Sequence, residues 1–162
     1  MISGKTLKYD ANDINTDVIW PGKYTYVQIP PEEMQKHAME TFDPDFGRKL
    51  AGKSILVVGT NMGCGSSREQ ASECLKYSGI KAIIAKSFAR IFYRNSINLG
   101  LPVIESPELV DAISDGDDVQ IDLANGEALV NDKTFRIPTY PQFVMEILEA
   151  GGLIEHIRRQ KQ

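Results

Sequence analysis

The sequence is poor in residues that bind metals. It contains two cysteines, Cys64 and Cys74, and two histidines, His37 and His156. A structural zinc site takes four cysteine or histidine ligands at characteristic spacings, which these residues do not show. We therefore expect no metal site built by this chain alone. Neither histidine lies near the end of a predicted strand, so a Ser-His-Asp hydrolase is not expected either.

Long apolar runs and an excess of basic residues are also missing. The N-terminal MISGKTLKYD has no apolar core of a secretory signal, and no apolar run reaches membrane-spanning length. We therefore expect a cytoplasmic protein without a disulfide. Lysine and arginine number 18 against 22 aspartates and glutamates, a formal charge of −4, which does not favour nucleic-acid binding. The basic run His156–Lys161 is expected to be a solvated helix end.

Short apolar runs alternate with amphipathic stretches in the middle of the chain. Strands are predicted at Gly4–Tyr9, Ile55–Val58, Ala82–Ala85 and Pro102–Glu105, and helices at Ser67–Ser78 and Ser87–Leu99. This order implies right-handed β-α-β units and a parallel core sheet. Before them, the sequence predicts a helix from Pro30 to about Glu40 and an irregular segment from Thr41 to Gly52.

The last third of the sequence has a different character. Asn125-Gly126 separates Val119–Leu123 from Glu127–Val130 and is a strong signal for a β-hairpin. A strand at Thr134–Ile137 and a helix at Pro141–Ala150 are predicted to follow. With 162 residues, of which 42% are hydrophobic, the chain can form one α/β domain over residues 1–162. The expected architecture is three-layered or barrel-like, with a parallel core sheet and an antiparallel β annex.

The most informative segment is ILVVGTNMGCGSSREQ, residues 55–70. An apolar strand breaks at Gly59 into a loop that carries Gly63 and Gly65, and two serines, an arginine and a glutamate then open a helix. Glycines let backbone N–H groups approach a ligand, and a helix N-terminus adds partial positive charge. Hydroxyl and guanidinium groups add further donors. The loop is therefore predicted to bind a carboxylate or a phosphate.

Other interpretations of this loop exist. A tight strand-to-helix turn in which Ser66 or Ser67 caps the helix would use the same residues. The pattern is G-x-G-x-x-R rather than the dinucleotide-binding G-x-G-x-x-G, and a P-loop lysine is missing. Cys64, inside the loop, could be a nucleophile, although no histidine is near it in the sequence. Cys74 occupies an apolar position of the following helix and is expected in the core.

A second polar cluster precedes the glycine loop in the sequence. NTDVIWPGKYTY, residues 15–26, places Asp17 directly before an apolar run. A carboxylate in such a place usually has a cationic partner. Either Lys23 or an arginine elsewhere in the chain is expected to fill that role.

A third polar cluster is KSFARIFYRN, residues 86–95. Ser87 is a natural helix N-cap. An apolar stripe typical of a core is formed by Phe88, Ile91 and Phe92. Residues expected to be solvated or to support neighbouring loops are Arg90, Arg94 and Asn95.

Three motifs together resemble the small subunits of 3-isopropylmalate dehydratases, which belong to the aconitase superfamily: GCGSSREQA, the later IIAKSFARIFYRNSINLGLPV and the upstream NTDVIWPGKY. The resemblance is clear over about Ser3–Glu105. It implies a swivelling β/α/β domain like the C-terminal domain of aconitase. It also implies a hydro-lyase of leucine biosynthesis, which isomerises a hydroxy-diacid by dehydration and rehydration.

The resemblance further implies a partner. In this family a [4Fe–4S] cluster is held by a separate large subunit, in a heterodimer or heterotetramer, and its iron would polarise the leaving hydroxyl. The two thiols of this chain are too few to hold such a cluster. The active site is therefore expected to form where the two subunits meet.

Residue roles follow from the same resemblance. Ser66 matches the serine that acts, as an alkoxide, as the catalytic base, and Ser67 and Arg68 match binders of a substrate carboxylate. A serine alkoxide needs stabilisation, which backbone N–H groups, the helix N-terminus and Arg68 can supply. Lys23 stands where many relatives carry a carboxylate-binding arginine, and a lysine offers no bidentate fork. Asp17 is grouped with these binding candidates.

Tyr24, Thr25 and Tyr26, with Val27, match the family's loop that meets the variable substituent of the substrate. This loop has no arginine and suits an isopropyl or methyl group, so isopropylmalate is favoured, with citramalate or dimethylmalate next. Homoaconitate would require a cation there. We expect loop 23–27 to be mobile without the partner. A non-catalytic anion-binding module and an independent cysteine enzyme remain alternatives.

Overall fold

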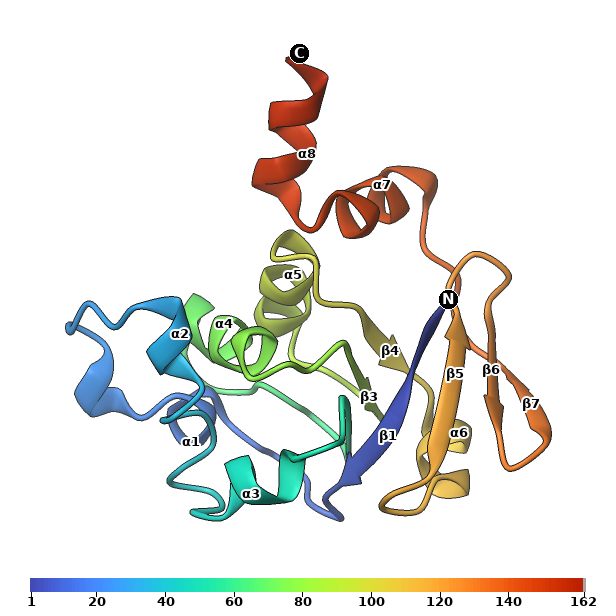
Figure 1. The fold of residues 1–162 in the computed structure, drawn as a ribbon, viewed down its shortest axis with the longest axis horizontal. Helices are drawn as coiled ribbons and strands as arrows, with labels where there is room; N and C mark the ends of the chain where they lie inside the picture. The colour runs from blue at the N-terminus through green and yellow to red at the C-terminus, as the bar shows by residue number, and fades with distance from the viewer. Residues whose placement is uncertain (162) are drawn as a thin grey trace.

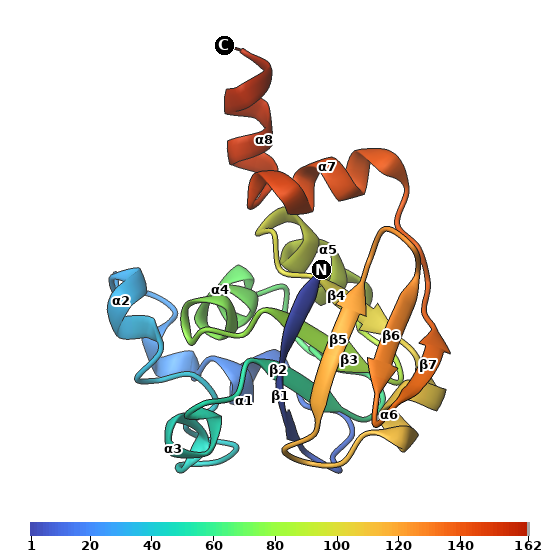
Figure 2. The same cartoon turned by 45° about the vertical axis from the view of Figure 1, so that its right-hand side comes forward.

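The computed structural model describes residues 1–161, and its seven strands form one mixed sheet (Figures 1 and 2). The strand order is β4-β3-β2-β1-β5-β6-β7. The strands are β1 (Ile2–Lys8), β2 (Ile55–Val58), β3 (Ala82–Ala85), β4 (Val103–Glu105), β5 (Asp118–Asp122), β6 (Glu127–Val130) and β7 (Lys133–Arg136). The strands β1 to β4 are parallel, and β1 pairs antiparallel with β5. The predicted combination of a parallel core sheet and an antiparallel annex is confirmed.

The two inner strands of the parallel half, β2 and β3, are buried at every position. Such continuous apolar strands are typical of a parallel sheet covered on both faces. Leu56 and Val58 belong to one core cluster, and Ile55 and Val57 belong to another on the opposite face. The short apolar runs at β2 and β3 therefore mark the middle of the parallel half of the sheet.

The main helices cover one face of the sheet because the strand order advances in one direction from β1 to β4 and each crossover is right-handed. They are α1 (Thr16–Ile19), α2 (Pro31–Met34), α3 (Phe46–Leu50), α4 (Glu69–Tyr77) and α5 (Arg90–Asn98). Their apolar side chains join the core cluster of Leu56 and Val58. Cys74 is fully buried in that cluster, as expected.

The opposite face is covered by α6 (Pro107–Ala112) together with the inward side chains of β5 and β6. The sharp turn at Asn131 and Asp132, both with positive φ, joins β6 to β7. The chain then forms α7 (Gln142–Ala150), which ends at Gly151 in the left-handed region, and α8 (Leu153–Gln160). Figure 1 shows α8 standing out from the body of the protein. No helix of residues 1–161 combines the length and hydropathy that a membrane crossing requires.

Several local predictions were wrong. The helix expected from Pro30 to about Glu40 ends as α2 at Met34, and the chain soon reaches positive φ at Met39, which an α-helix cannot contain. The segment expected to be irregular contains α3, and α6 was not predicted. Ser87 does not cap α5, since its hydroxyl accepts a hydrogen bond from the Asn61 N–H at 2.8 Å.

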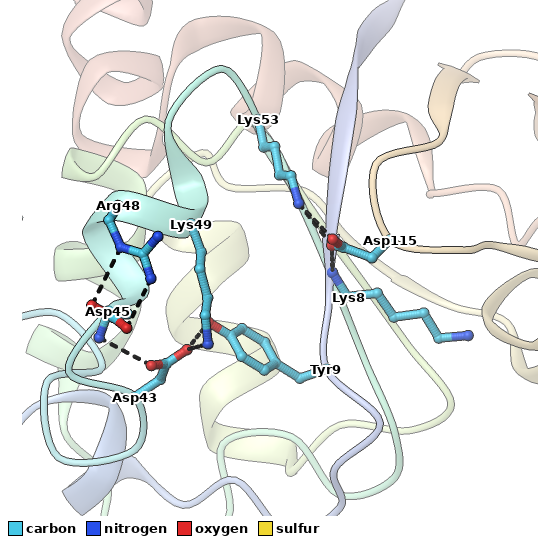
Figure 3. Close-up of polar contacts among 8 residues, drawn as sticks. All are labelled: Lys8, Tyr9, Asp43, Asp45, Arg48, Lys49, Lys53 and Asp115. Atoms are coloured by element: carbon cyan, nitrogen blue, oxygen red, sulfur yellow. Dashed lines mark hydrogen bonds and ion pairs between the residues drawn. The ribbon is translucent and has the colours of Figure 1, made fainter.

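A compact ionic cluster fastens α3 to β1 (Figure 3). Asp43 accepts hydrogen bonds from the Tyr9 hydroxyl at 2.8 Å and from Lys49 Nζ at 2.7 Å. Nearby, Asp115 accepts from Lys53 Nζ at 2.7 Å and from the Lys8 N–H at 2.9 Å. The hydrogen bond from Lys49 lowers the pKa of Asp43 below its ordinary value. Each carboxylate of this cluster is matched by donors of the chain itself.

Candidate functional site

The candidate site lies beyond the carboxyl ends of β1, β2 and β3, which meet at one edge of the sheet. The loops there continue the pairing of the strands. The Gly63 N–H donates to the Ile14 carbonyl at 2.8 Å, and the Met62 N–H donates to the Ser87 carbonyl at 3.0 Å. Three separate segments of the sequence are thereby held together as one backbone unit.

The glycine loop needs its glycines. Gly63 has a φ of +79°, and a Cβ there would lie 2.1 Å from the Phe92 ring carbon Cγ. Gly65 has a φ of +98°. Positive φ is readily adopted by glycine and costs other residues strain. Helix α4 then begins after Arg68 with no side-chain cap, so neither Ser66 nor Ser67 is used as an N-cap. Both serines are exposed.

Ser66 is paired with the buried Thr16. Their two hydroxyl oxygens lie 3.0 Å apart, and the Thr16 hydroxyl also lies 3.0 Å from the Ser66 carbonyl, to which it can donate. A threonine hydroxyl has one proton. When that proton points to the Ser66 carbonyl, the Thr16 oxygen accepts from Ser66. Thr16 is 1% exposed, and its N–H donates to the Cys64 carbonyl at 2.8 Å, so its position is fixed.

Arg68 is oriented by the segment around α1. Its Nη1 lies 2.9 Å from Asp17 Oδ1 and donates to the Trp20 carbonyl at 3.1 Å. The guanidinium also lies over Gly22, where a Cβ would approach Arg68 Nη2 to 3.4 Å. The expected cationic partner of Asp17 is therefore Arg68 and not Lys23. The structure brings Asp17, Arg68 and Ser66 to the same edge of the sheet.

Lys23 instead pairs with Glu40, with Nζ 3.0 Å from Oε1, and lies over the Tyr24 ring. The hydrogen bond with Glu40 raises the pKa of Lys23, whereas the hydrogen bonds from Lys23 and His37 outweigh burial and lower the pKa of Glu40. Tyr24 packs on His37 with ring centroids 4.3 Å apart. The first half of loop 23–27 is thus tied to its own chain.

The second half of that loop projects outward. Tyr26 is 98% exposed and Val27 is 55% exposed. A hollow of about 600 Å³ separates the loop from α4, and Thr25 and Trp20 are among its lining residues. The buried Thr25 Oγ1 and Trp20 Nε1 have no hydrogen-bond partner within residues 1–161. Unpaired buried polar atoms cost roughly 1–3 kcal/mol each, so this loop is the least satisfied part of the site region.

A second hollow, of about 430 Å³, lies between the glycine loop and α5. It is lined by Ser66, Gly63 and Gly65 on one side and by Arg90, Ile91 and Arg94 on the other. Ile91 is 50% exposed, so its expected place in the core was wrong, while Phe92 is buried. The sequence predicted that Arg90 and Arg94 are solvated or support neighbouring loops, and it did not predict that they border this hollow. Their spacing of four on a helix indicated only that both lie on one face.

The thiols and acidic groups give no metal centre in the described part of the chain. No group of three or more histidine, cysteine, aspartate or glutamate residues among residues 1–161 is placed to hold a metal ion. Burial, with a smaller contribution from Asp13, raises the pKa of Cys64 above its ordinary value. A thiol with a raised pKa is a poorer nucleophile at neutral pH. The geometry therefore disfavours a cysteine enzyme.

Comparison with known proteins agrees with this arrangement. The family model of the aconitase C-terminal domain matches residues 1–109. The 3-isopropylmalate dehydratase small subunit of Caldanaerobacter subterraneus subsp. tengcongensis is 48% identical over 161 residues, covering 98% of this chain and 99% of the relative. Small subunit 1 of Thermotoga maritima is 45% identical, covering 98% of this chain and 96% of the relative.

A solved structure agrees as well. The crystal structure of 3-isopropylmalate dehydratase from Methanocaldococcus jannaschii superimposes with a TM-score of 0.89 at 45% identity and covers 99% of this chain and 95% of that one. The identity extends well beyond the motif region, since it spans both the parallel half and the antiparallel annex. The chain belongs to the aconitase C-terminal domain family and, within it, to the small subunits of 3-isopropylmalate dehydratases.

Proposed function

We propose that this chain is the small subunit of a hydro-lyase that interconverts 2-isopropylmalate and 3-isopropylmalate in the leucine biosynthesis of the cytoplasm. The observation that carries the proposal is the edge of the sheet at which exposed Ser66 lies beside buried Thr16 and an Arg68 oriented by Asp17. The full-length relatives that bear the name of this enzyme support it.

In this proposal Ser66 takes the proton from the carbon next to a substrate carboxylate. That proton is weakly acidic, so the base must be strong and its anion stabilised. The Thr16 hydroxyl can turn its proton from the Ser66 carbonyl to the Ser66 oxygen once the latter is ionised, since both acceptors lie 3.0 Å away. Backbone N–H groups at the start of α4 add partial positive charge.

Arg68 and Ser67 would hold the carboxylate of the substrate. A guanidinium offers a planar fork of donors that matches a carboxylate. Asp17 and the Trp20 carbonyl engage Nη1, which fixes the plane of the fork and leaves its other donors for a ligand. Lys23 would reach the substrate by giving up Glu40, so its part in binding is smaller than that of Arg68.

The second half of the active site belongs, in this proposal, to a large subunit that carries the [4Fe–4S] cluster. The described residues of this chain do not fit such a cluster: Cys74 is buried in the core, and no set of three candidate ligands occurs within residues 1–161. Removal of the hydroxyl is therefore the task of the partner. This chain supplies the base and the carboxylate site, and the two subunits form a heterodimer or a heterotetramer.

Substrate choice would rest on loop 23–27. Tyr26 and Val27 are exposed and apolar or aromatic, and the cation of the loop is already paired with Glu40. A surface of this kind suits an isopropyl or methyl substituent better than a third carboxylate. Isopropylmalate is proposed over citramalate and dimethylmalate. A hydrophobic pocket distinguishes substrates that differ by one methylene by only about 1–3 kcal/mol of transition-state binding energy. Homoaconitate is disfavoured.

A reconstitution assay tests the proposal. The chain is mixed with a cluster-bearing large subunit, and turnover is measured with isopropylmalate, citramalate, dimethylmalate and homoaconitate. We expect turnover only with both subunits and the highest kcat/KM with isopropylmalate. Activity of the isolated chain, or anion binding without any association with a large subunit, would contradict the proposal and favour an independent enzyme or an anion-binding module.

A further inference from the structure

Two arginines of this chain are left without an ionic partner. The sequence has seven arginines. Four of them pair with carboxylates: Arg48, Arg68, Arg136 and Arg158. Arg159 donates to the Ala150 carbonyl. Within residues 1–161, Arg90 and Arg94 have no ion pair, and both are exposed.

The two unpaired guanidinium groups flank an exposed apolar side chain. Arg90, Ile91 and Arg94 lie together on the first turns of α5, and we call these three residues the α5 patch. Ile91 is 50% exposed although it lies in a helix whose other large apolar residues are mostly covered. Arginine is enriched in protein–protein interfaces and at their hot spots, where it can pair with carboxylates of the partner.

The α5 patch borders the same hollow as Ser66. Arg94 also borders a neighbouring hollow of about 330 Å³ between α5 and α7, which contains Phe143, 62% exposed. The α5 patch therefore extends from the hollow beside Ser66 to the hollow beside α7. A surface that runs past the proposed reaction site in this way is larger than a small diacid needs.

We propose that the α5 patch is a docking surface for acidic and apolar side chains of the cluster-bearing large subunit. This inference rests on the proposed function and names the chemistry of its partner. Two guanidinium groups without carboxylates in their own chain can be neutralised across the interface. The chain has a net charge of −4, so it attracts an acidic partner surface only where cations gather, as Arg90 and Arg94 do at the edge that carries Ser66.

A substrate carboxylate is the competing occupant, and the geometry favours the protein partner. The guanidinium aligned by the chain for a small anion is Arg68, which Asp17 and the Trp20 carbonyl hold in place. No such fixation is present at Arg90 or Arg94 within residues 1–161. Long unpaired side chains beside an exposed isoleucine suit a surface that becomes ordered when another protein covers it.

The test compares the double variant R90Q/R94Q with the matched control K81Q/K133Q. Lys81 and Lys133 are exposed and have no ion pair within residues 1–161, and they lie outside the hollow, so both variants lose the same charge. Affinity for the large subunit is measured by biolayer interferometry without substrate, at low and high salt. R90Q/R94Q is expected to raise Kd at least about tenfold at low salt and to weaken the salt dependence, whereas the control changes Kd less than about twofold.

Steady-state kinetics separate docking from substrate binding. At saturating large subunit, R90Q/R94Q should keep KM and kcat within about twofold of the unchanged chain. A second variant, Ile91→Ser, should also raise Kd, and circular dichroism should show that both variants are folded. A raised KM with unchanged Kd, or equal Kd values for R90Q/R94Q and the control, would overturn the proposal. If the unchanged chain itself does not bind a large subunit, the proposed function fails as well.

Discussion

Two polar regions of this protein, both next to ends of β strands, differ in how completely their charges are matched. Around Asp43 and Asp115, each carboxylate accepts hydrogen bonds from a lysine and from a second donor of the chain (Figure 3). Around Ser66, by contrast, the serines are exposed, Arg68 is only partly engaged, and Arg90 and Arg94 have no partner within residues 1–161.

The difference separates structural from functional polarity. A cluster that satisfies itself holds two elements together and has nothing left to offer a ligand. A cluster whose hydrogen-bond donors lack partners in the chain, as around Ser66, can bind a ligand or another protein. Changes in the first region should therefore alter stability, and changes in the second should alter turnover or assembly.

The largest expected effect is on turnover, from Ser66→Ala. Removal of a general base typically costs about 10²–10⁴ in rate, so kcat of the reconstituted enzyme should fall at least a hundredfold. The melting temperature and the affinity for the large subunit should stay the same, because the Ser66 side chain is exposed. Ser78→Ala, on the far end of α4, serves as a matched control. Near-normal turnover of Ser66→Ala would show that Ser66 is not the base.

The next effect is expected from Arg68→Lys. A lysine keeps the charge but loses the fork that Asp17 and the Trp20 carbonyl orient. Hydrogen bonds to charged groups are worth about 1.5–3 kcal/mol, so kcat/KM should fall about 10- to 100-fold. Initial rates over a range of isopropylmalate concentrations measure it. Lys23→Met, measured alongside, should lower kcat/KM less than Arg68→Lys does. If kcat/KM falls further in the Lys23 variant, the main carboxylate site lies in loop 23–27.

A smaller effect is expected from Thr16→Val. This variant keeps the shape of a buried residue and removes the hydroxyl that lies 3.0 Å from Ser66 Oγ. Loss of one hydrogen bond to the developing anion should lower kcat about tenfold and shift the acidic limb of the pH–rate profile, which reports ionisation of the base, to higher pH. Thr16→Ser restores the hydroxyl and should restore the rate. If Thr16→Val and Thr16→Ser lose activity equally, the effect is one of packing.

The smallest effect belongs to the matched region and concerns stability alone. Asp43→Asn should lower the free energy of unfolding by about 1 kcal/mol at pH 7, with turnover unchanged. Because donors lower the pKa of Asp43 in the folded state, its stabilisation is present above about pH 4, the unfolded value, and is lost as the pH falls through the folded value. Urea unfolding at pH 7 and pH 3 should therefore show a difference between Asp43→Asn and the unchanged chain that shrinks in acid. A constant difference would exclude this ionic origin.

Sequence reasoning predicted the sheet well because its parallel strands β2 and β3 are distinct apolar runs and Asn125-Gly126 marks the hairpin. It failed where local signals were overruled. Ser87 has the chemistry of an N-cap, but its hydroxyl is used by the Asn61 N–H, a residue 26 positions away. α3 carries too few apolar residues to be recognised alone, and it is held by Lys49 and Asp43.

The candidate site was predicted in part. Ser66 and Arg68 stand out in the sequence because glycines and a helix start surround them. The sequence predicted a cationic partner for Asp17, either Lys23 or an arginine elsewhere in the chain, but it could not identify Arg68, since it does not give the distance between them. Arg90 and Arg94 were missed because a solvated helix face and a docking surface have the same local pattern. What distinguishes the two arginines from a solvated helix face is the hollow that they share with Ser66 of the glycine loop, and this hollow is visible only in the folded chain.

The pairing of the three loops beyond the strand ends has a consequence for assembly. Since the amides of Gly63, Thr16 and Met62 are already hydrogen-bonded to neighbouring loops, this half of the cleft is ordered before any partner arrives. Association then requires little loss of conformational entropy on this side, apart from loop 23–27 and the long arginine side chains. The backbone around Ser66 is preorganised, so the chain can meet its partner as a rigid body whose reactive geometry does not have to be created by binding.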